Sequence, residues 1–129
     1  MNPDVPGLEA CQRLAKAGYD APAHHFYDTA TGKLYGEGLT VSGAASPVTR
    51  EVAEQLRGVL APTLGEMLAE IRRRGWCVIL ENLGKEPKPW ACSVWSETSA
   101  DIGGGSDAAM SADALALALA EAVEKEGKP

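Results

Sequence analysis

The sequence predicts an α+β protein in which a small antiparallel sheet packs under helices, and three observations lead to this class. Apolar residues recur at helical spacing near the start of the chain, after position 63 and near its end. Two β-prone runs, at 76–80 and 90–95, flank a turn rich in glycine and proline. A helix, two or three strands and a closing helix allow such a sheet to bury one face beneath two helices.

The length of 129 residues is typical of one domain, so we expect a single unit over residues 1–129. The hydrophobic fraction of 45% and the charged fraction of 23% are those of a globular chain rather than a disordered one. We expect residues 1–60 to hold a helix, a hairpin and a connecting segment. Residues 61–127 are expected to form an α-β-β-(β)-α core.

The first elements of the chain are a helix and a hairpin. Apolar residues from Leu8 to Ala15 fall at helical spacing, and Gly18 suits the left-handed position that follows a helix. Residues 24–35 place aromatic side chains on both sides of a turn that ends at Gly32. This pattern predicts a small β-hairpin.

The segment from 36 to 58 has weaker signals. Residues 36–45 are rich in glycine, serine, threonine and alanine, which favours a loop or a weak edge strand. Ser46 followed by Pro47 resembles an N-cap and a first helical residue, and apolar residues then recur every fourth position. A short second helix that ends before Gly58 is expected.

The clearest local signal is a capping box at Thr63 and Glu66. The Thr63 side chain can accept a hydrogen bond from the Glu66 amide while the Glu66 carboxylate accepts one from Thr63. The helix that follows is expected to end at Gly75, with Glu70 and the arginines outside its buried face. That buried face is predicted to carry Leu64, Met67, Leu68 and Ile71.

The strands follow this helix. Residues 76–80 are apolar on both alternating faces, which predicts a central strand covered on two sides. Residues 90–95 form its antiparallel partner across the glycine and proline turn. Residues 96–109 leave two alternatives open, a third strand around 100–104 or a mobile segment.

The chain closes with a predicted amphipathic helix. Ser111 offers an N-cap, and Asp113 lies in the first turn, where a carboxylate is favourable. An apolar stripe runs from Leu115 to Val123, and Gly127 marks the end.

Charge and cysteine usage limit the classes of function. With 12 Lys plus Arg against 18 Asp plus Glu, the net charge is −6, which disfavours nucleic acid and acidic membrane surfaces as partners. The chain opens without an export signal and has no apolar run long enough to span a bilayer, so we expect a soluble, cytoplasmic protein. Three widely spaced cysteines are expected to be reduced and mostly buried.

No motif predicts catalysis, and we expect neither an enzyme nor a bound cofactor or metal. His24 and His25 point to opposite faces of a strand, and no second metal ligand lies at a suitable spacing. The run Gly103 to Ser106 lacks the lysine of a phosphate-binding loop, so a flexible or edge-terminating loop is expected. No local pattern pairs a cysteine with a histidine base.

Five residues form the candidate interaction surface. The arginines at the end of the capped helix favour a solvated, dipole-compensating role, and their alternative role is contact with a phosphate or an acidic partner. Trp95 lies on the opposite pleat face from Trp90, so one of the two is expected on an exposed patch. Leu117 falls on the polar side of the last helix. The candidate residues are therefore Arg72, Arg73, Arg74, Trp95 and Leu117.

Several runs carry a resemblance to a known group of proteins. APTLGEMLAEIRRRGWCVILE, WACSVW and SADALALALAEAV resemble small bacteriophage or prophage proteins of unknown function, including the phage α-β-α sandwich (ABA sandwich) type, and LAKAGYDAPAHHFYDTATGKLY is similar to the segment that precedes them. The segment 36–57 departs from that compact pattern. The α-β-β-(β)-α order also resembles double-stranded-RNA-binding domains and, in part, HicB-like antitoxins, but neither the acidic charge nor the end of the chain fits their nucleic-acid binding.

The resemblance implies a phage-derived accessory protein, and it supplies no active-site residues. We expect non-catalytic binding to a protein partner, with inhibition of a host nucleic-acid-binding or defence complex as a specific version. The alternative is a nucleic-acid-binding module that uses Arg72 to Arg74 and an aromatic strand face. Homo-oligomerisation stays open at this level.

Overall fold

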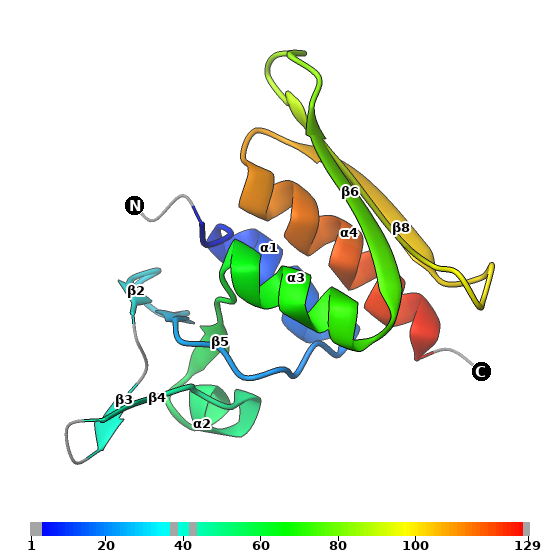
Figure 1. The fold of residues 1–129 in the computed structure, drawn as a ribbon. Coiled ribbons are helices and arrows are strands. Elements are labelled where there is room, and N and C mark those ends of the chain that lie inside the picture. Colours follow the sequence, from blue (N-terminus) through cyan, green and yellow to red (C-terminus); the bar gives the residue numbers. More distant parts are fainter. Residues whose placement is uncertain (1–3, 37–38, 42–43, 128–129) are drawn as a thin grey trace.

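The computed structural model describes residues 4–36, 39–41 and 44–127. A helix-and-sheet unit fills the second half of the chain, and α1 packs against it, whereas the elements from β1 to β5 lie to one side (Figure 1). This arrangement confirms the α+β class. The elements are α1 (Leu8–Ala17), β1 (Phe26–Asp28), β2 (Leu34–Tyr35), β3 (Leu39–Val41), β4 (Ala44–Ser46), α2 (Arg50–Gln55), β5 (Gly58–Leu60), α3 (Leu64–Arg73), β6 (Trp76–Asn82), β7 (Trp90–Ser96), β8 (Gly103–Ala108) and α4 (Ser111–Glu126).

The C-terminal sheet is antiparallel and has the strand order β6-β7-β8. The predicted hairpin of β6 and β7 is confirmed, with Val78 opposite Val94. The third strand, which the sequence left open, is β8, and it begins later than the predicted 100–104. The prediction that β6 is central is wrong, because β8 pairs with the other side of β7 and leaves β6 at an edge.

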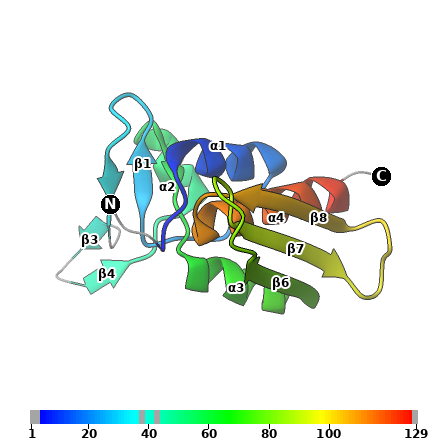
Figure 2. The same ribbon diagram turned by 90° about the horizontal axis from the view of Figure 1, so that it is seen from above.

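Helix α4 is the centre of the core. Figure 2 shows α1 on one side of α4 and α3 on the other, and the strands β7 and β8 also pack against it. Its buried residues occur on nearly every side, so the prediction of an amphipathic helix is wrong; a helix that is apolar all round is typical of a buried one. Those residues are Ala112, Ala114, Leu115, Ala116, Ala118, Leu119, Ala120, Ala122 and Val123.

Strand β8 approaches α4 closely because glycine lies at the contact. A Cβ atom on Gly104 would overlap the carbonyl oxygen of Ala118 and lie 2.7 Å from the Cβ atom of Glu121. The Ser106 hydroxyl donates a hydrogen bond to the Ala114 carbonyl. The glycine-rich run was expected to be a loop, and this prediction is wrong because the contact with α4 needs the small side chains.

The start of α4 also differs from the prediction. Met110 is at the N-cap position without a side-chain hydrogen bond, and Ser111 is already helical. The carboxylate of Asp113 accepts a hydrogen bond from the Gly7 amide, with an N···O distance of 2.6 Å. Asp113 therefore joins the start of α1 to the start of α4.

The predicted ends of α1 and α3 are confirmed. Gly18 has the left-handed φ of 105° directly after α1. Thr63 and Glu66 form the reciprocal capping box, with N···O distances of 2.8 and 3.1 Å. The buried face of α3 differs from the prediction, because Leu68 is 37% exposed whereas Glu70 is 7% exposed and lies among arginine side chains.

The elements before α3 form two small sheets. The predicted hairpin of β1 and β2 is confirmed, and β5, which the sequence analysis missed, pairs with β1. The strands β3 and β4 pair with each other where a loop or a single weak strand was expected, although residues 37–38 and 42–43 of that segment lie outside the described residues.

The second helix begins later than predicted. Val48 exchanges two backbone hydrogen bonds with Ala23, at 2.7 and 3.0 Å, so its backbone is not available for a helix. Thr49 is the N-cap in place of Ser46, and its hydroxyl accepts a hydrogen bond from the Val52 amide. In the part of the chain that the structure describes, no helix is both long and apolar enough to cross a membrane.

Packing crosses the predicted division at residue 60. Leu14 and Tyr19, from α1 and the turn after it, belong to the same buried cluster as Leu119 of α4. The C-terminal unit therefore has α1 as a third packed helix beside α3 and α4.

Candidate interaction surface

The β6–β7–β8 sheet has one covered face and one uncovered face. Alternate residues of each strand face the helices, and the remaining ones point away from them. We call the second set the open face. It consists of Cys77, Ile79, Glu81, Ala91, Ser93, Trp95, Gly103, Gly105 and Asp107.

Two large apolar side chains are exposed on the open face. Ile79 is 53% exposed and Trp95 is 36% exposed. They are diagonal neighbours on adjacent strands, because Ile79 pairs with Ser93 and Trp95 lies two residues further along. The predicted opposite orientation of the two tryptophans is confirmed, since Trp90 packs against the buried core.

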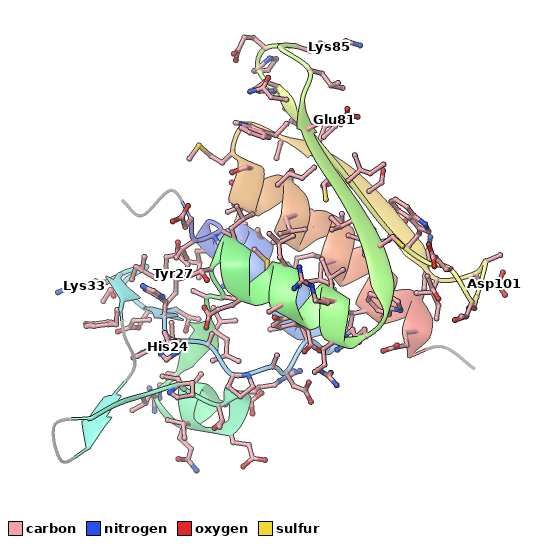
Figure 3. All side chains as sticks on the ribbon, in the orientation of Figure 1. His24, Tyr27, Lys33, Glu81, Lys85 and Asp101 are labelled. Atoms are coloured by element: carbon pink, nitrogen blue, oxygen red, sulfur yellow. The ribbon has the colours of Figure 1, made fainter. Side chains whose placement is uncertain are left out.

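The open face is negatively charged. Glu81 and Asp107 are its only charged residues, and no lysine or arginine occupies an outward position on the three strands. Glu81 lies at the end of the sheet near the turn that carries Lys85, whereas Asp101 marks the opposite end (Figure 3). The apolar pair is therefore bordered by carboxylates, which favours contact with a basic surface.

The three arginines after α3 do not form one exposed patch. Glu70 accepts hydrogen bonds from Arg73 at 2.6 Å and from Arg74 at 2.8 Å. The Arg74 side chain is only 11% exposed, also pairs with Glu126 at 2.5 Å, and lies 5.1 Å from the ring centre of Trp76. Arg74 therefore connects α3, β6 and the end of α4, and it is a structural residue.

The ion pairs around Glu70 change its protonation. The hydrogen bond from Arg73 lowers the pKa of Glu70, and the hydrogen bond from Arg74 adds to this effect, whereas burial opposes it. Glu70 is therefore charged at neutral pH despite its burial.

Arg72 is exposed and makes no ion pair with the described residues. It lines a groove of about 360 Å³ between α3 and β6, together with Leu68, Ile71, Gly75, Trp76 and Val78.

Leu117 lies in a different groove, on the helix side of the sheet. This groove has a volume of about 640 Å³ and includes Leu8, Arg13 and Ala108. Leu117 is half-buried there, and Arg13 forms a 2.8 Å ion pair with Glu124. The structure thus separates Leu117 from Trp95, and neither of them lies with the arginines.

The thiols are held in the protonated form. Burial raises the pKa of Cys11 to about 12 and that of Cys92 to about 11. On the open face, a hydrogen bond to Glu97 raises the pKa of Cys77. A thiol with a raised pKa is a poor nucleophile at neutral pH. Within the described ranges, no three His, Cys, Asp or Glu side chains gather closely enough to hold a metal ion.

Comparison with protein-family models, curated proteins and solved structures gives no match for this chain. Sequence reasoning identified Trp95 but missed Ile79, because β6 was predicted to be covered on both faces. The available signal was Glu81, a charged residue in the same alternating set as Ile79.

Proposed function

We propose that this chain is a non-catalytic protein-binding module of phage or prophage origin, and that it binds its partner through the open face. The observation that carries the proposal is the exposed Trp95 beside the exposed Ile79. Tryptophan is enriched at the energetic centres of protein interfaces, where a large side chain is fully buried on binding. The phage origin rests on the resemblance of the capped helix, the tryptophan-containing strand and the Ala/Leu helix to phage proteins.

The charge of the open face defines the partner. Glu81 and Asp107 lie at one end of the open face, on either side of Ala91 and beside the row that holds Ile79, so a complementary surface has an apolar projection with lysine or arginine next to it. A host nucleic-acid-binding or defence complex would present lysine and arginine in the groove that holds its nucleic acid. Carboxylates of the open face would occupy such a groove in place of phosphates and inhibit the complex.

The nucleic-acid-binding alternative has less support. It needs a cluster of free guanidinium groups, but Arg73 and Arg74 are hydrogen-bonded to Glu70. Of the three arginines, only Arg72 makes no ion pair with the described residues, and the outward strand positions around Trp95 include no lysine or arginine to contact phosphates.

The test is capture from a host lysate with the immobilised chain, compared across three forms. Trp95→Ala removes the proposed anchor, and Leu68→Ala is the matched control because its side chain is equally exposed but lies on α3. We expect wild type and Leu68→Ala to retain one specific protein, which Trp95→Ala loses and which added salt weakens. Recovery of no protein, or equal recovery by all three forms, would contradict the proposal.

A second assay distinguishes the proposed protein-binding function from the nucleic-acid-binding alternative. Fluorescence anisotropy with labelled DNA and RNA at low salt is expected to show no binding by the wild-type chain. Salt-dependent binding that disappears in Arg72→Gln would instead support the nucleic-acid-binding module.

A further inference from the structure

The two edges of the C-terminal sheet differ in how their backbone groups are covered. The Ser96 amide donates a hydrogen bond to the Ile102 carbonyl, at an N···O distance of 3.1 Å. Hydrogen-bonded and non-hydrogen-bonded pairs alternate along an antiparallel ladder, so the amide of Gly105, three residues after Ile102, points away from β7. This amide donates to the Glu121 carboxylate of α4, at 3.4 Å. A side chain of α4 therefore covers part of the β8 edge.

The β6 edge has no such cover. The Leu83 amide donates a hydrogen bond to the Pro89 carbonyl, at an N···O distance of 2.7 Å. Counting back from this pair, every second residue of β6 is hydrogen-bonded to β7, and these residues are Cys77, Ile79 and Glu81. The remaining residues of β6 direct their backbone groups away from β7, and no other described element hydrogen-bonds to them. These edge residues are Trp76, Val78, Leu80 and Asn82.

We propose that β6 pairs antiparallel with β6 of a second copy of this chain, which joins two three-stranded sheets into one. The strand runs from Trp76 to Asn82, and its central residue is Ile79. A two-fold axis beside Ile79 aligns all seven residues of both strands. In this register Val78 faces Leu80 of the second copy, and these are residues whose backbone groups point to the free edge. The residues with free backbone groups therefore lie opposite each other across the two-fold axis, where they can form hydrogen bonds between the two copies.

The side chains fit the same register. Ile79 of one copy faces Ile79 of the other as a non-hydrogen-bonded pair, the type in which side chains are closest. The pairing would cover the most exposed of the large apolar side chains among the described residues, which is 53% exposed in the single chain. On the helix side of the sheet, Val78 of one copy meets Leu80 of the other.

The charges favour a second copy as the occupant of this edge. Glu81 is the only charged residue of β6, and the register places it opposite Cys77 of the second copy, away from the other Glu81. Arg72 is exposed at the Trp76 end of the strand, where it lines the groove with Trp76 and Val78. Antiparallel pairing brings the Glu81 end of the second copy to this end, so each end of the interface combines Arg72 on the helix side with Glu81 of the other copy on the open face, and no like charges of β6 face each other.

The sharpest test is a symmetric disulfide. In a Cys77→Ser background, Ile79→Cys places two thiols in the non-hydrogen-bonded pair, where Cα atoms about 4.5 Å apart lie within the range for a disulfide. Ser93→Cys is the matched control, because it is exposed on the same face but lies on β7. We expect mild oxidation to link most of the Ile79→Cys chains into dimers and few of the Ser93→Cys chains. Equal cross-linking of both variants would overturn the proposal.

Sedimentation velocity measures the same contact without cross-linking. The wild-type chain is expected to be a dimer, and Leu80→Pro is expected to raise the dimer dissociation constant by about tenfold or more. Because the Leu80 amide points to the free edge, proline there removes bonds to the second copy and none to β7. Unchanged circular dichroism would show that the fold is retained. A wild-type monomer at millimolar concentration would overturn the proposal, as would an edge that pairs only with another protein.

This inference shares Ile79 with the proposed function but rests on the free edge of β6, so the two can be tested separately. Trp95→Ala is expected to leave the dimer intact, because Trp95 lies on β7 and not at the β6 edge. A chain that dimerises but captures no host protein would contradict only the proposed function. A monomer that captures its partner through Trp95 would contradict only the dimer.

Discussion

The two faces of the C-terminal sheet are built from alternate residues of the same three strands, yet their surroundings are opposite. On the helix side, Gly104 and Ser106 touch the backbone of α4 directly. On the open face, Gly105 would place a Cβ atom no closer than 3.6 Å to its nearest neighbour, and Trp95 is exposed. The comparison indicates that residue composition alone does not determine which face of the sheet is buried. The elements that pack against alternate residues determine it.

The largest expected effect is the loss of stability on adding one methyl group at the helix contact. In Gly104→Ala the new Cβ atom would overlap the carbonyl of Ala118, so β8 and α4 must separate. We expect a loss of about 3 kcal/mol, at the upper end of the cost of overpacking a core. Gly105→Ala, one residue later on the open face, should change stability by no more than about 0.5 kcal/mol.

Urea denaturation of the two alanine variants gives this comparison directly. Neither glycine has a positive φ, so strain in the backbone does not complicate the result. Equal free energies of unfolding for the two variants would break the distinction between the two faces.

A smaller effect is expected from the buried carboxylate on the helix side. Glu70→Gln removes the charge that accepts hydrogen bonds from Arg73 and Arg74. We expect a loss of about 2 kcal/mol at neutral pH, typical of hydrogen bonds to a charged group. The control is Glu81→Gln on the open face, which should have little effect on the free energy of unfolding.

The same carboxylate predicts a pH dependence. Because its pKa is lower in the folded chain than its ordinary value of 4.5, its contribution to stability is complete above that value. The contribution is lost as the pH falls through the lowered folded pKa. We therefore expect the acid-induced loss of stability to be smaller in Glu70→Gln than in wild type. Parallel pH profiles for the two proteins would contradict the buried ion pair.

The smallest expected effect is a difference in chemical labelling between two thiols on adjacent strands, and it does not involve a change in stability. Cys77 lies on the open face and is half-buried, whereas Cys92 faces α4 and is buried. A thiol reagent is expected to modify Cys77 in the folded chain and Cys92 only when the chain opens, at least about tenfold more slowly. Since the pKa of Cys77 is raised, its labelling rate should increase with pH beyond the range of an ordinary thiol. Mass spectrometry of peptides after timed labelling measures both rates.

Local signals in the sequence predicted the parts of the fold that local interactions determine. The capping box at Thr63 and Glu66 depends on residues three positions apart, and Gly18 ends α1 through its own backbone conformation. The pleat alternation likewise separated Trp95 from Trp90. Each of these features is complete within a few residues of sequence, so a pattern was sufficient to identify it.

The features that were missed depend on partners distant in the chain. The glycine-rich β8 forms a strand because α4 lies against it, and Gly104 has no local property that indicates this contact. The arginines were treated as one cluster, but Glu70 turns Arg73 and Arg74 toward α3, and Glu126 at the end of α4 holds Arg74. Ile79 was assigned to a buried face because a strand that is apolar on both faces looks central until its sheet neighbours are known.

The register of the three strands tests the central claim most directly, because a slip of one residue exchanges the two faces of a strand. Nuclear Overhauser effects between α-protons identify the non-hydrogen-bonded pairs of an antiparallel sheet. We expect cross-peaks between Val78 and Val94 and between Ser93 and Gly105. A cross-peak from Ile79 to Val94 in place of the first would turn Ile79 toward α4 and contradict the open face.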